Sequence, residues 1–143
     1  MDNSEILTIL RKAVAPGDEE LTAIYQLAGY DPAKADSKHH TGSQALRAFL
    51  EGLILRERGP RADNKPPTLD AGELTNNDIL KKLRIALNLQ EIDMQLVFEE
   101  GGATLSASEV NSLFRKPGNK HFRPCSDDVL LQFLAGLMPS LEV

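Results

Sequence analysis

The chain has 143 residues, of which 41% are hydrophobic and 26% are charged, and this length and composition suit one globular domain or two half-sized lobes. No apolar run approaches the ~20 residues of a membrane span. The formal net charge is -5 and neither half is globally basic, which argues against a general nucleic-acid-binding protein without excluding a local basic patch. A single cysteine excludes an internal disulfide, and the first residues lack a basic, apolar signal peptide, so we expect a cytoplasmic protein that makes no use of a membrane.

An internal duplication organises the whole chain. Residues 2–29 align without a gap with residues 75–102, and residues 43–53 align with residues 127–137. We therefore expect two tandem helical repeats, at 1–58 and 74–143, joined by a linker at 59–73 that is rich in Pro, Gly and charge. Because a repeat of this size has only a small core, the two copies are expected to pack on each other as a pseudo-symmetric bundle.

The first repeat predicts three helices and one short turn. Asp2 and Glu5 have capping-box spacing, and an apolar stripe then predicts a helix that ends at Pro16–Gly17. A second amphipathic helix stops at Gly29, where a left-handed C-cap is expected. Residues 32–36 leave room for a single turn, so this repeat lacks most of a third helix. Thr41 with Gln44 is expected to cap the last helix.

The second repeat predicts four helices. Thr75 with Asp78 starts the first, and the second ends at Gly101–Gly102. Ser106 with Glu109 starts a third, short helix that Pro117–Gly118 terminates, and Ser126 or Asp127 starts the fourth. No stretch shows the alternating pattern of a half-buried strand, so the expected fold class is all-α, with three to four short helices per repeat.

Two blocks, NNDILKKLRIALNL (76–89) and HFRPCSDDVLLQFLAGL (121–137), resemble the YehS-like family of small bacterial proteins, catalogued as domain of unknown function 1456. Members of that family carry two tandem copies of the domain, and the resemblance covers almost the whole chain. The first repeat departs from the pattern, because DPAKADSKHHTG (31–42) replaces the third helix and Thr41 stands where the second repeat has Cys125. The resemblance implies a fold and a cytoplasmic bacterial setting, but no activity, cofactor or catalytic residue.

The densest basic stretch follows the expected third helix of the second repeat. Its cations could contact phosphate groups of a nucleic acid; they are Arg115, Lys116, Lys120 and Arg123, with His121 among them. The blander interpretation is a solvated loop whose charges balance Asp127, Asp128 and the helix ends. Residues 89–116 also loosely resemble a helix-turn-helix, but the start of the would-be recognition helix carries no cation, and such helices are equally the material of helical bundles.

Cys125 lies four residues after His121, and His39 and His40 lie in the matching loop of the first repeat. These residues do not supply the four donors of a zinc site, and a Cys/His nucleophile would need a third, orienting group that nothing in the sequence signals. We therefore expect Cys125 to be a small buried side chain and His39 and His40 to face solvent. No metal, cofactor or catalytic residue is predicted.

Two further positions recur in both copies. Arg11 and Arg84 lie beside the apolar stripe, where they could mark an inter-repeat groove; more commonly such an arginine pairs with an acid of the next helix. Gly52 and Gly136 lie inside helices, where glycine costs about 1 kcal/mol relative to alanine. Their recurrence predicts a close helix crossing, which we assign to the contact between the repeats.

The function expected from these features is that of a non-enzymatic binding or regulatory module acting through a macromolecular partner, either another protein or a second copy of the chain. The apolar tail supports a protein contact through Leu137, Met138, Leu141 and Val143. The alternative is nucleic-acid binding through the basic loop at 115–123. An enzyme that uses Cys125 is the third hypothesis.

Overall fold

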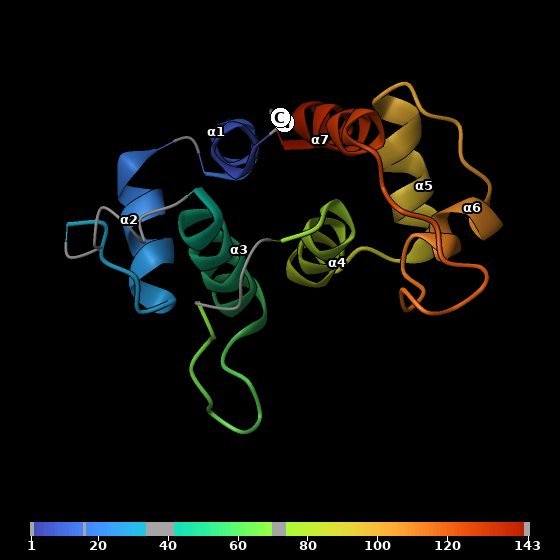
Figure 1. Ribbon diagram of the computed structural model, residues 1–143. Coiled ribbons are helices and arrows are strands. Elements are labelled where there is room, and N and C mark those ends of the chain that lie inside the picture. The colour runs from blue at the N-terminus through green and yellow to red at the C-terminus, as the bar shows by residue number, and fades with distance from the viewer. Residues whose placement is uncertain (1, 16, 34–41, 70–73, 142–143) are drawn as a thin grey trace. The chain divides into compact units, whose positions relative to one another are not determined.

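The structure, a computed structural model, describes residues 2–15, 17–33, 42–69 and 74–141, and the regular elements in these ranges are all helices (Figure 1). The all-α fold class is confirmed for this part of the chain. By its internal contacts the chain divides into two compact units, Met1–Leu74 and Thr75–Val143, here named unit 1 and unit 2.

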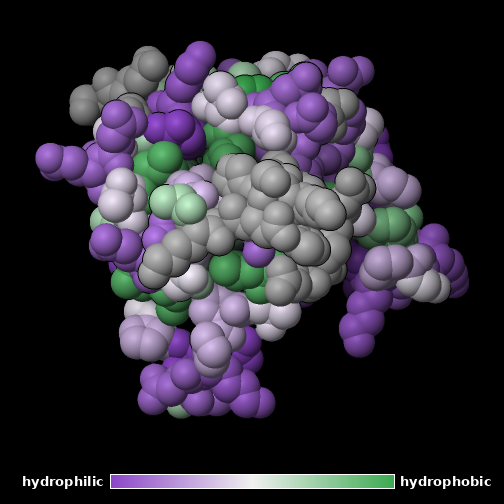
Figure 2. Space-filling model, turned by 60° about the vertical axis from the view of Figure 1, so that its left-hand side comes forward, coloured by the Kyte–Doolittle hydropathy of each residue, from purple (hydrophilic) through white to green (hydrophobic). Residues whose placement is uncertain are grey.

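Unit 1 contains α1 (Asn3–Val14), α2 (Asp18–Leu27) and α3 (Gly42–Arg58). The long helix α3 packs against both α1 and α2. After α3 the chain forms an irregular loop, residues 59–69, which extends away from the helices of unit 1 and is strongly hydrophilic (Figures 1 and 2). Pro32 and Ala33 lie in a turn, as expected, whereas the rest of that turn, His39, His40 and the expected cap Thr41 lie outside the described residues.

Unit 2 contains α4 (Asn76–Ala86), α5 (Glu91–Glu100), α6 (Ala107–Ser112) and α7 (Asp127–Leu141). Helix α5 packs against α7 on one side and α6 on another, and α7 also contacts α4. No helix among the described residues is both long and apolar enough to cross a membrane.

Three of the predicted helix starts are confirmed by their hydrogen bonds. The carboxylate of Asp2 accepts the backbone N–H of Glu5 at 2.9 Å. Thr75 with Asp78, and Ser106 with Glu109, form complete capping boxes. Gly29 and Gly102 follow their helices with φ of 73° and 93°, the left-handed conformation that glycine adopts without steric cost.

The third helix of the second repeat is shorter than predicted. It ends at Ser112 rather than near Pro117, and residues 113–126 form a loop. The carbonyl of Leu113 accepts a hydrogen bond from the side chain of Asn77 at 2.9 Å, and the side chain of Leu113 is buried. These tertiary contacts fix the chain in a turn at a point where the local sequence would allow further helix.

Each unit has its own apolar core. In unit 1 the large, fully buried side chains come from all three helices: Ile6, Leu10, Ile24, Leu46, Phe49, Leu50 and Leu53. In unit 2 they come from all four: Ile79, Leu80, Leu83, Met94, Phe98, Val110, Leu130, Phe133 and Leu134. The rings of Phe98 and Phe133 join α5 to α7 at a centroid distance of 5.1 Å.

Gly52 and Gly136 mark close helix crossings, but inside each unit. A Cβ atom on Gly52 would overlap the carbonyl oxygen of Ile24 in α2, and one on Gly136 would overlap that of Val97 in α5. The assignment of these glycines to the contact between the repeats is therefore wrong. The short side chain is needed so that α3 can approach α2, and α7 can approach α5, backbone to backbone.

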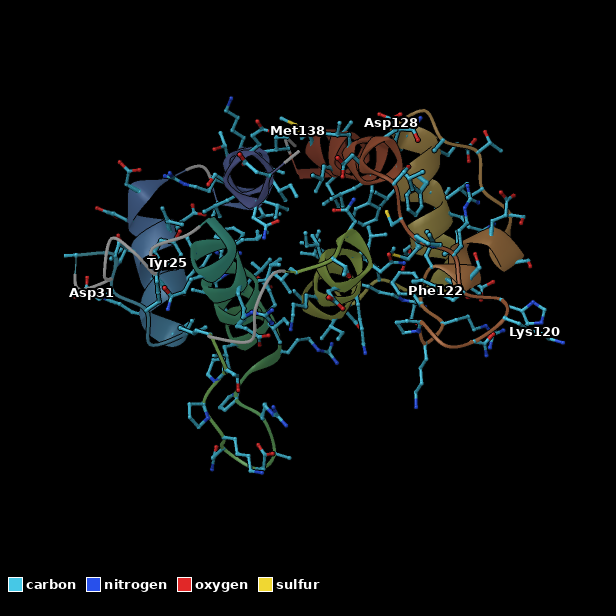
Figure 3. All side chains as sticks on the ribbon, viewed as in Figure 1. Tyr25, Asp31, Lys120, Phe122, Asp128 and Met138 are labelled. Carbon is cyan, nitrogen blue, oxygen red and sulfur yellow. The ribbon has the colours of Figure 1, made fainter. Side chains whose placement is uncertain are left out.

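The prediction that the apolar tail could face a partner is wrong for Leu137 and is not tested for the end of the tail. Leu137 is only 3% exposed and belongs to the core of unit 2, so it is not available to a partner. Met138, near the end of α7, is half-buried (Figure 3). The side chain of Leu141, and Val143 as a whole, lie outside the described residues.

Candidate functional site

Two asparagines at the start of α4 hold both ends of the basic loop of unit 2. The amide nitrogen of Asn77 donates to the carbonyls of Leu113 and Arg123, at 2.9 and 3.0 Å, and its oxygen accepts the N–H of Cys125 at 2.9 Å. The amide nitrogen of Asn76 donates to the carbonyl of Cys125 at 3.1 Å and to the carboxylate of Asp127 at 2.8 Å. The loop is thus tied to α4 at residues 113 and 123–127.

The loop also closes on itself and on α6. The N–H of Arg123 donates to the carbonyl of Ser112 at 3.0 Å, which brings the far end of the loop back to the end of α6. Within the loop the side chain of Asn119 accepts the N–H of His121 at 2.8 Å, and its carbonyl accepts the N–H of Phe122 at 3.0 Å. Backbone hydrogen bonds therefore define the path of the segment that carries the cations.

An open cavity of about 650 Å³, here named the loop cavity, lies between α6 and this loop. It is lined by residues with polar or charged side chains: Ser108, Glu109, Asn111, Ser112, Arg115, His121 and Arg123. Arg115 and Arg123, eight positions apart in the sequence, are brought to the same cavity by the fold. Lys116 and Lys120 lie on the same loop and are exposed, but they are not part of the lining; Figure 3 shows Lys120 at the outer edge of unit 2.

The charges around the loop cavity are only partly balanced. A guanidinium nitrogen of Arg123 lies 3.3 Å from a carboxylate oxygen of Glu109, so Glu109 is an acid that balances the loop and that the sequence did not indicate. The pKa of Glu109 lies below its usual value, mainly because of a hydrogen bond with the backbone of Ser106 and next because of one with its side chain. Glu109 is therefore a carboxylate at neutral pH. Across the described residues, Arg115 makes no ion pair, and neither do Lys116 and Lys120.

Cys125 is buried, as predicted, with 7% of its surface exposed. Burial raises the pKa of its thiol to about 11, and the carboxylate of Asp127 acts in the same direction. The group is therefore a protonated thiol at neutral pH. Within the described residues no cluster of three or more His, Cys, Asp or Glu side chains is arranged to hold a metal ion.

The repeated arginines make different contacts in the two units. Arg11 pairs with Asp18 at the start of α2, at 3.1 Å, as expected for an acid of the next helix. Arg84 departs from that expectation, because its Nε donates to the carbonyl of Leu89 at 3.1 Å and its guanidinium lies 4.8 Å from the centre of the Phe114 ring. The proposed inter-repeat groove at Arg11 and Arg84 stays a prediction.

Sequence reasoning missed four of the seven residues that line the loop cavity, and both asparagines that hold the loop. Three of the missed residues had a local signal, because Ser108, Asn111 and Ser112 follow the i, i+3, i+4 spacing of one polar helix face, which the predicted Arg115 extends to i+7. The sequence signal for Asn76 and Asn77 was weaker. They follow Thr75, which already forms the helix cap with Asp78, so their side-chain amides can form hydrogen bonds with other segments.

Residues 76–140 match the family model described as "Protein of unknown function (DUF1456)". This range lies within unit 2 and includes α4, α5, α6 and the loop cavity. A relative from Escherichia coli (strain K12), "Uncharacterized protein YehS", is 41% identical over 93 residues. These findings support the YehS-like family. The alignment with the YehS protein covers 64% of this chain and 58% of that protein, and no solved structure matches.

Proposed function

We propose that this protein is a non-enzymatic binding or regulatory module that acts through a macromolecular partner, and that the loop cavity of unit 2 contacts that partner. The observation that carries the proposal is that Arg115, His121 and Arg123 meet around one cavity. Asn77 and Ser112 hold the backbone that presents them. A loop that is already ordered loses less conformational entropy when it binds, which favours a role in recognition.

Phosphate groups are the ligands that suit these side chains best. A guanidinium offers a planar fork of donors to phosphate oxygens, the hydroxyls of Ser108 and Ser112 offer further donors, and Lys116 and Lys120 add charge on the same loop. We therefore propose a nucleic acid, held by its backbone, as the anionic partner. The carboxylate of Glu109 and the net charge of -5 oppose a long polyanion, so binding is expected to be weak and sensitive to salt.

Fluorescence anisotropy with labelled duplex DNA and with labelled RNA, each titrated at several salt concentrations, tests this function. We expect binding at low salt, with a slope of log affinity against log salt of about -2 to -3, since each phosphate contact contributes about -0.9. Arg115→Glu with Lys116→Glu should abolish binding, whereas Lys12→Glu, an exposed cation of α1, should change it little. Absence of binding to both nucleic acids at low salt, or an equal loss in Lys12→Glu, would contradict the proposal.

The non-enzymatic part of the proposal is supported by the state of Cys125. This residue is the candidate nucleophile of the enzyme hypothesis, yet its thiol is buried and its pKa is raised to about 11. A nucleophilic cysteine instead needs an exposed site that favours the thiolate. We also propose the cytoplasmic location expected from the sequence, which fractionation of cells that express the full chain would test.

We further propose that both units descend from one copied helical unit, and that the whole chain follows the tandem pattern of the YehS-like family. The support is a shared contact. Gly52 lies against the carbonyl of Ile24 and Gly136 against that of Val97, and both the glycines and the residues that they contact are aligned in the two repeats. Experimental coordinates for both units test the idea by superposition of α1, α2 and α3 on α4, α5 and α7. Different crossings of these helices would exclude a common origin.

A further inference from the structure

Helix α5 exposes apolar side chains on the face opposite its buried one. Ile92 and Leu96 are 61% and 52% exposed, and a spacing of four residues places them one turn apart on the same face. Met94 and Phe98 on the other side of the helix are fully buried against the rest of unit 2. The helix is therefore apolar on two faces, and the fold buries only the face that carries Met94 and Phe98.

Two acids lie beside this apolar pair. Glu99 and Glu100 form the last turn of α5, both are exposed, and neither makes an ion pair with any residue that the structure describes. The C-terminal end of a helix carries partial negative charge, so acids at this position oppose the helix dipole. Their placement is not favoured by the helix dipole, and it puts two exposed negative charges three and four residues after Leu96.

The aligned helix of unit 1 shows that the fold does not require this pattern. Ile92 and Leu96 correspond to Glu19 and Ala23 of α2, and the two acids correspond to Gln26 and Leu27. Helix α2 packs on α3 through the same kind of glycine crossing as α5 on α7, yet it carries neither the exposed apolar pair nor the terminal acids. The outer face of α5 is thus a separate surface feature of unit 2.

We propose that the outer face of α5 docks a basic amphipathic helix of another protein. Apolar side chains of that helix, spaced by four residues, would cover Ile92 and Leu96, and its lysines or arginines would meet Glu99 and Glu100. Charge complementarity selects this occupant, because an acidic or neutral helix would leave both acids beside an apolar contact without a partner. The inference extends the proposed role as a binding module to a second surface, which shares no residue with the loop cavity.

The probe is a synthetic 18-residue helical peptide with leucines at positions i and i+4 and lysines on both flanks, measured by isothermal titration calorimetry against the full chain. We expect binding that Ile92→Ala with Leu96→Ala weakens at least tenfold. Glu99→Gln with Glu100→Gln should weaken it about fivefold and remove most of its salt dependence. A peptide with glutamate in place of lysine should not bind.

Two variants act as controls. Leu27→Ala removes a leucine of unit 1 that is 48% exposed and should leave the affinity unchanged. Arg115→Glu alters the loop cavity alone, so unchanged peptide binding in this variant separates the two surfaces even if nucleic-acid binding fails. Circular dichroism shows whether each variant remains helical.

Three results would overturn the inference. The first is that the lysine peptide does not bind. The second is that all variants bind it equally, which would reduce the interaction to attraction by the net charge of the chain. The third is a dimer in analytical ultracentrifugation that Ile92→Ala with Leu96→Ala dissociates, which would identify a second copy of this chain as the occupant.

Discussion

At the scale of single residues, Asn77 does the most to define the loop cavity. Its one side-chain amide bonds to three backbone groups, at Leu113, Arg123 and Cys125, that lie 36 to 48 positions away in the sequence. All three bonds have the usual N–H···O length, and two of them are partly buried. A partly buried backbone group that loses its partner is costly, so replacement of this residue should be felt both in stability and in the position of the cations.

We therefore expect Asn77→Ala to lower the free energy of unfolding by about 2 kcal/mol, since several backbone groups lose their hydrogen bonds at once. Urea denaturation measures the change. Ser4→Ala is the matched control, because Ser4 aligns with Asn77 and its side chain is exposed. A loss below about 0.5 kcal/mol in Asn77→Ala would mean that the loop keeps its path without the asparagine.

The thiol of Cys125 provides a second test at this scale. With its pKa raised from 9.0 to about 11, its thiolate fraction at pH 8 should be about 100-fold below that of an unfolded cysteine, and alkylation should be slowed at least as much. Mass spectrometry after timed iodoacetamide treatment measures the rate, and the same protein in urea is the control. Equal rates in the two conditions would show that the thiol is not buried.

The same shift sets the pH dependence of stability. A folded pKa above the unfolded value favours the protonated, folded form. The contribution of the Cys125 thiol to the free energy of unfolding is therefore fully present below pH 9.0 and is lost as the pH rises through about 11. We expect unit 2 to lose stability over this interval, and Cys125→Ala to lose less of it. Parallel declines in the two proteins would assign the alkaline effect to other groups.

At the scale of helices, the features that were predicted correctly depend on neighbours in sequence. A capping box involves residues three positions apart, as at Thr75 with Asp78. A glycine C-cap depends on a single residue that adopts the left-handed backbone conformation directly after the helix. The features that were missed depend on contacts between distant segments. Three such features are the early end of α6, the position of Arg84 over the ring of Phe114, and the close approach of Gly136 to α5 of its own unit. All three result from tertiary packing, which the spacing of neighbouring residues does not encode.

The glycine crossing gives a prediction for these elements. In Gly136→Ala the gain in helix propensity, about 1 kcal/mol, is opposed by the overlap of the new methyl group with the backbone carbonyl of Val97. Since backbone can move only if α5 and α7 separate, we expect a net loss of about 2 kcal/mol in thermal or urea unfolding. Gly118→Ala, in open space, is the control and should change stability little. A stabilised Gly136→Ala would show that the helices can part without cost.

At the scale of the whole molecule, the acids and bases are shared evenly. Residues 1–60 and 74–143 each contain nine acids and seven bases, so the binding surfaces proposed for unit 2 arise from the arrangement of its charges and not from their total. The loop cavity gathers cations, whereas the end of α5 gathers acids. Unit 2 can therefore present one surface that favours an anionic partner and another that favours a cationic partner.

Each unit has its own buried core and its own glycine crossing, so disruption of one crossing should first affect the unit that contains it. We expect Gly52→Val to reduce amide protection in α2 and α3 and to leave α5 and α7 protected, with the reverse pattern for Gly136→Val. Hydrogen–deuterium exchange with peptide-level mass spectrometry resolves these segments. Equal loss of protection in all four helices, from either substitution, would show instead that the chain unfolds as one cooperative body. That result is the one expected if the small core of each repeat depends on the other repeat for its stability.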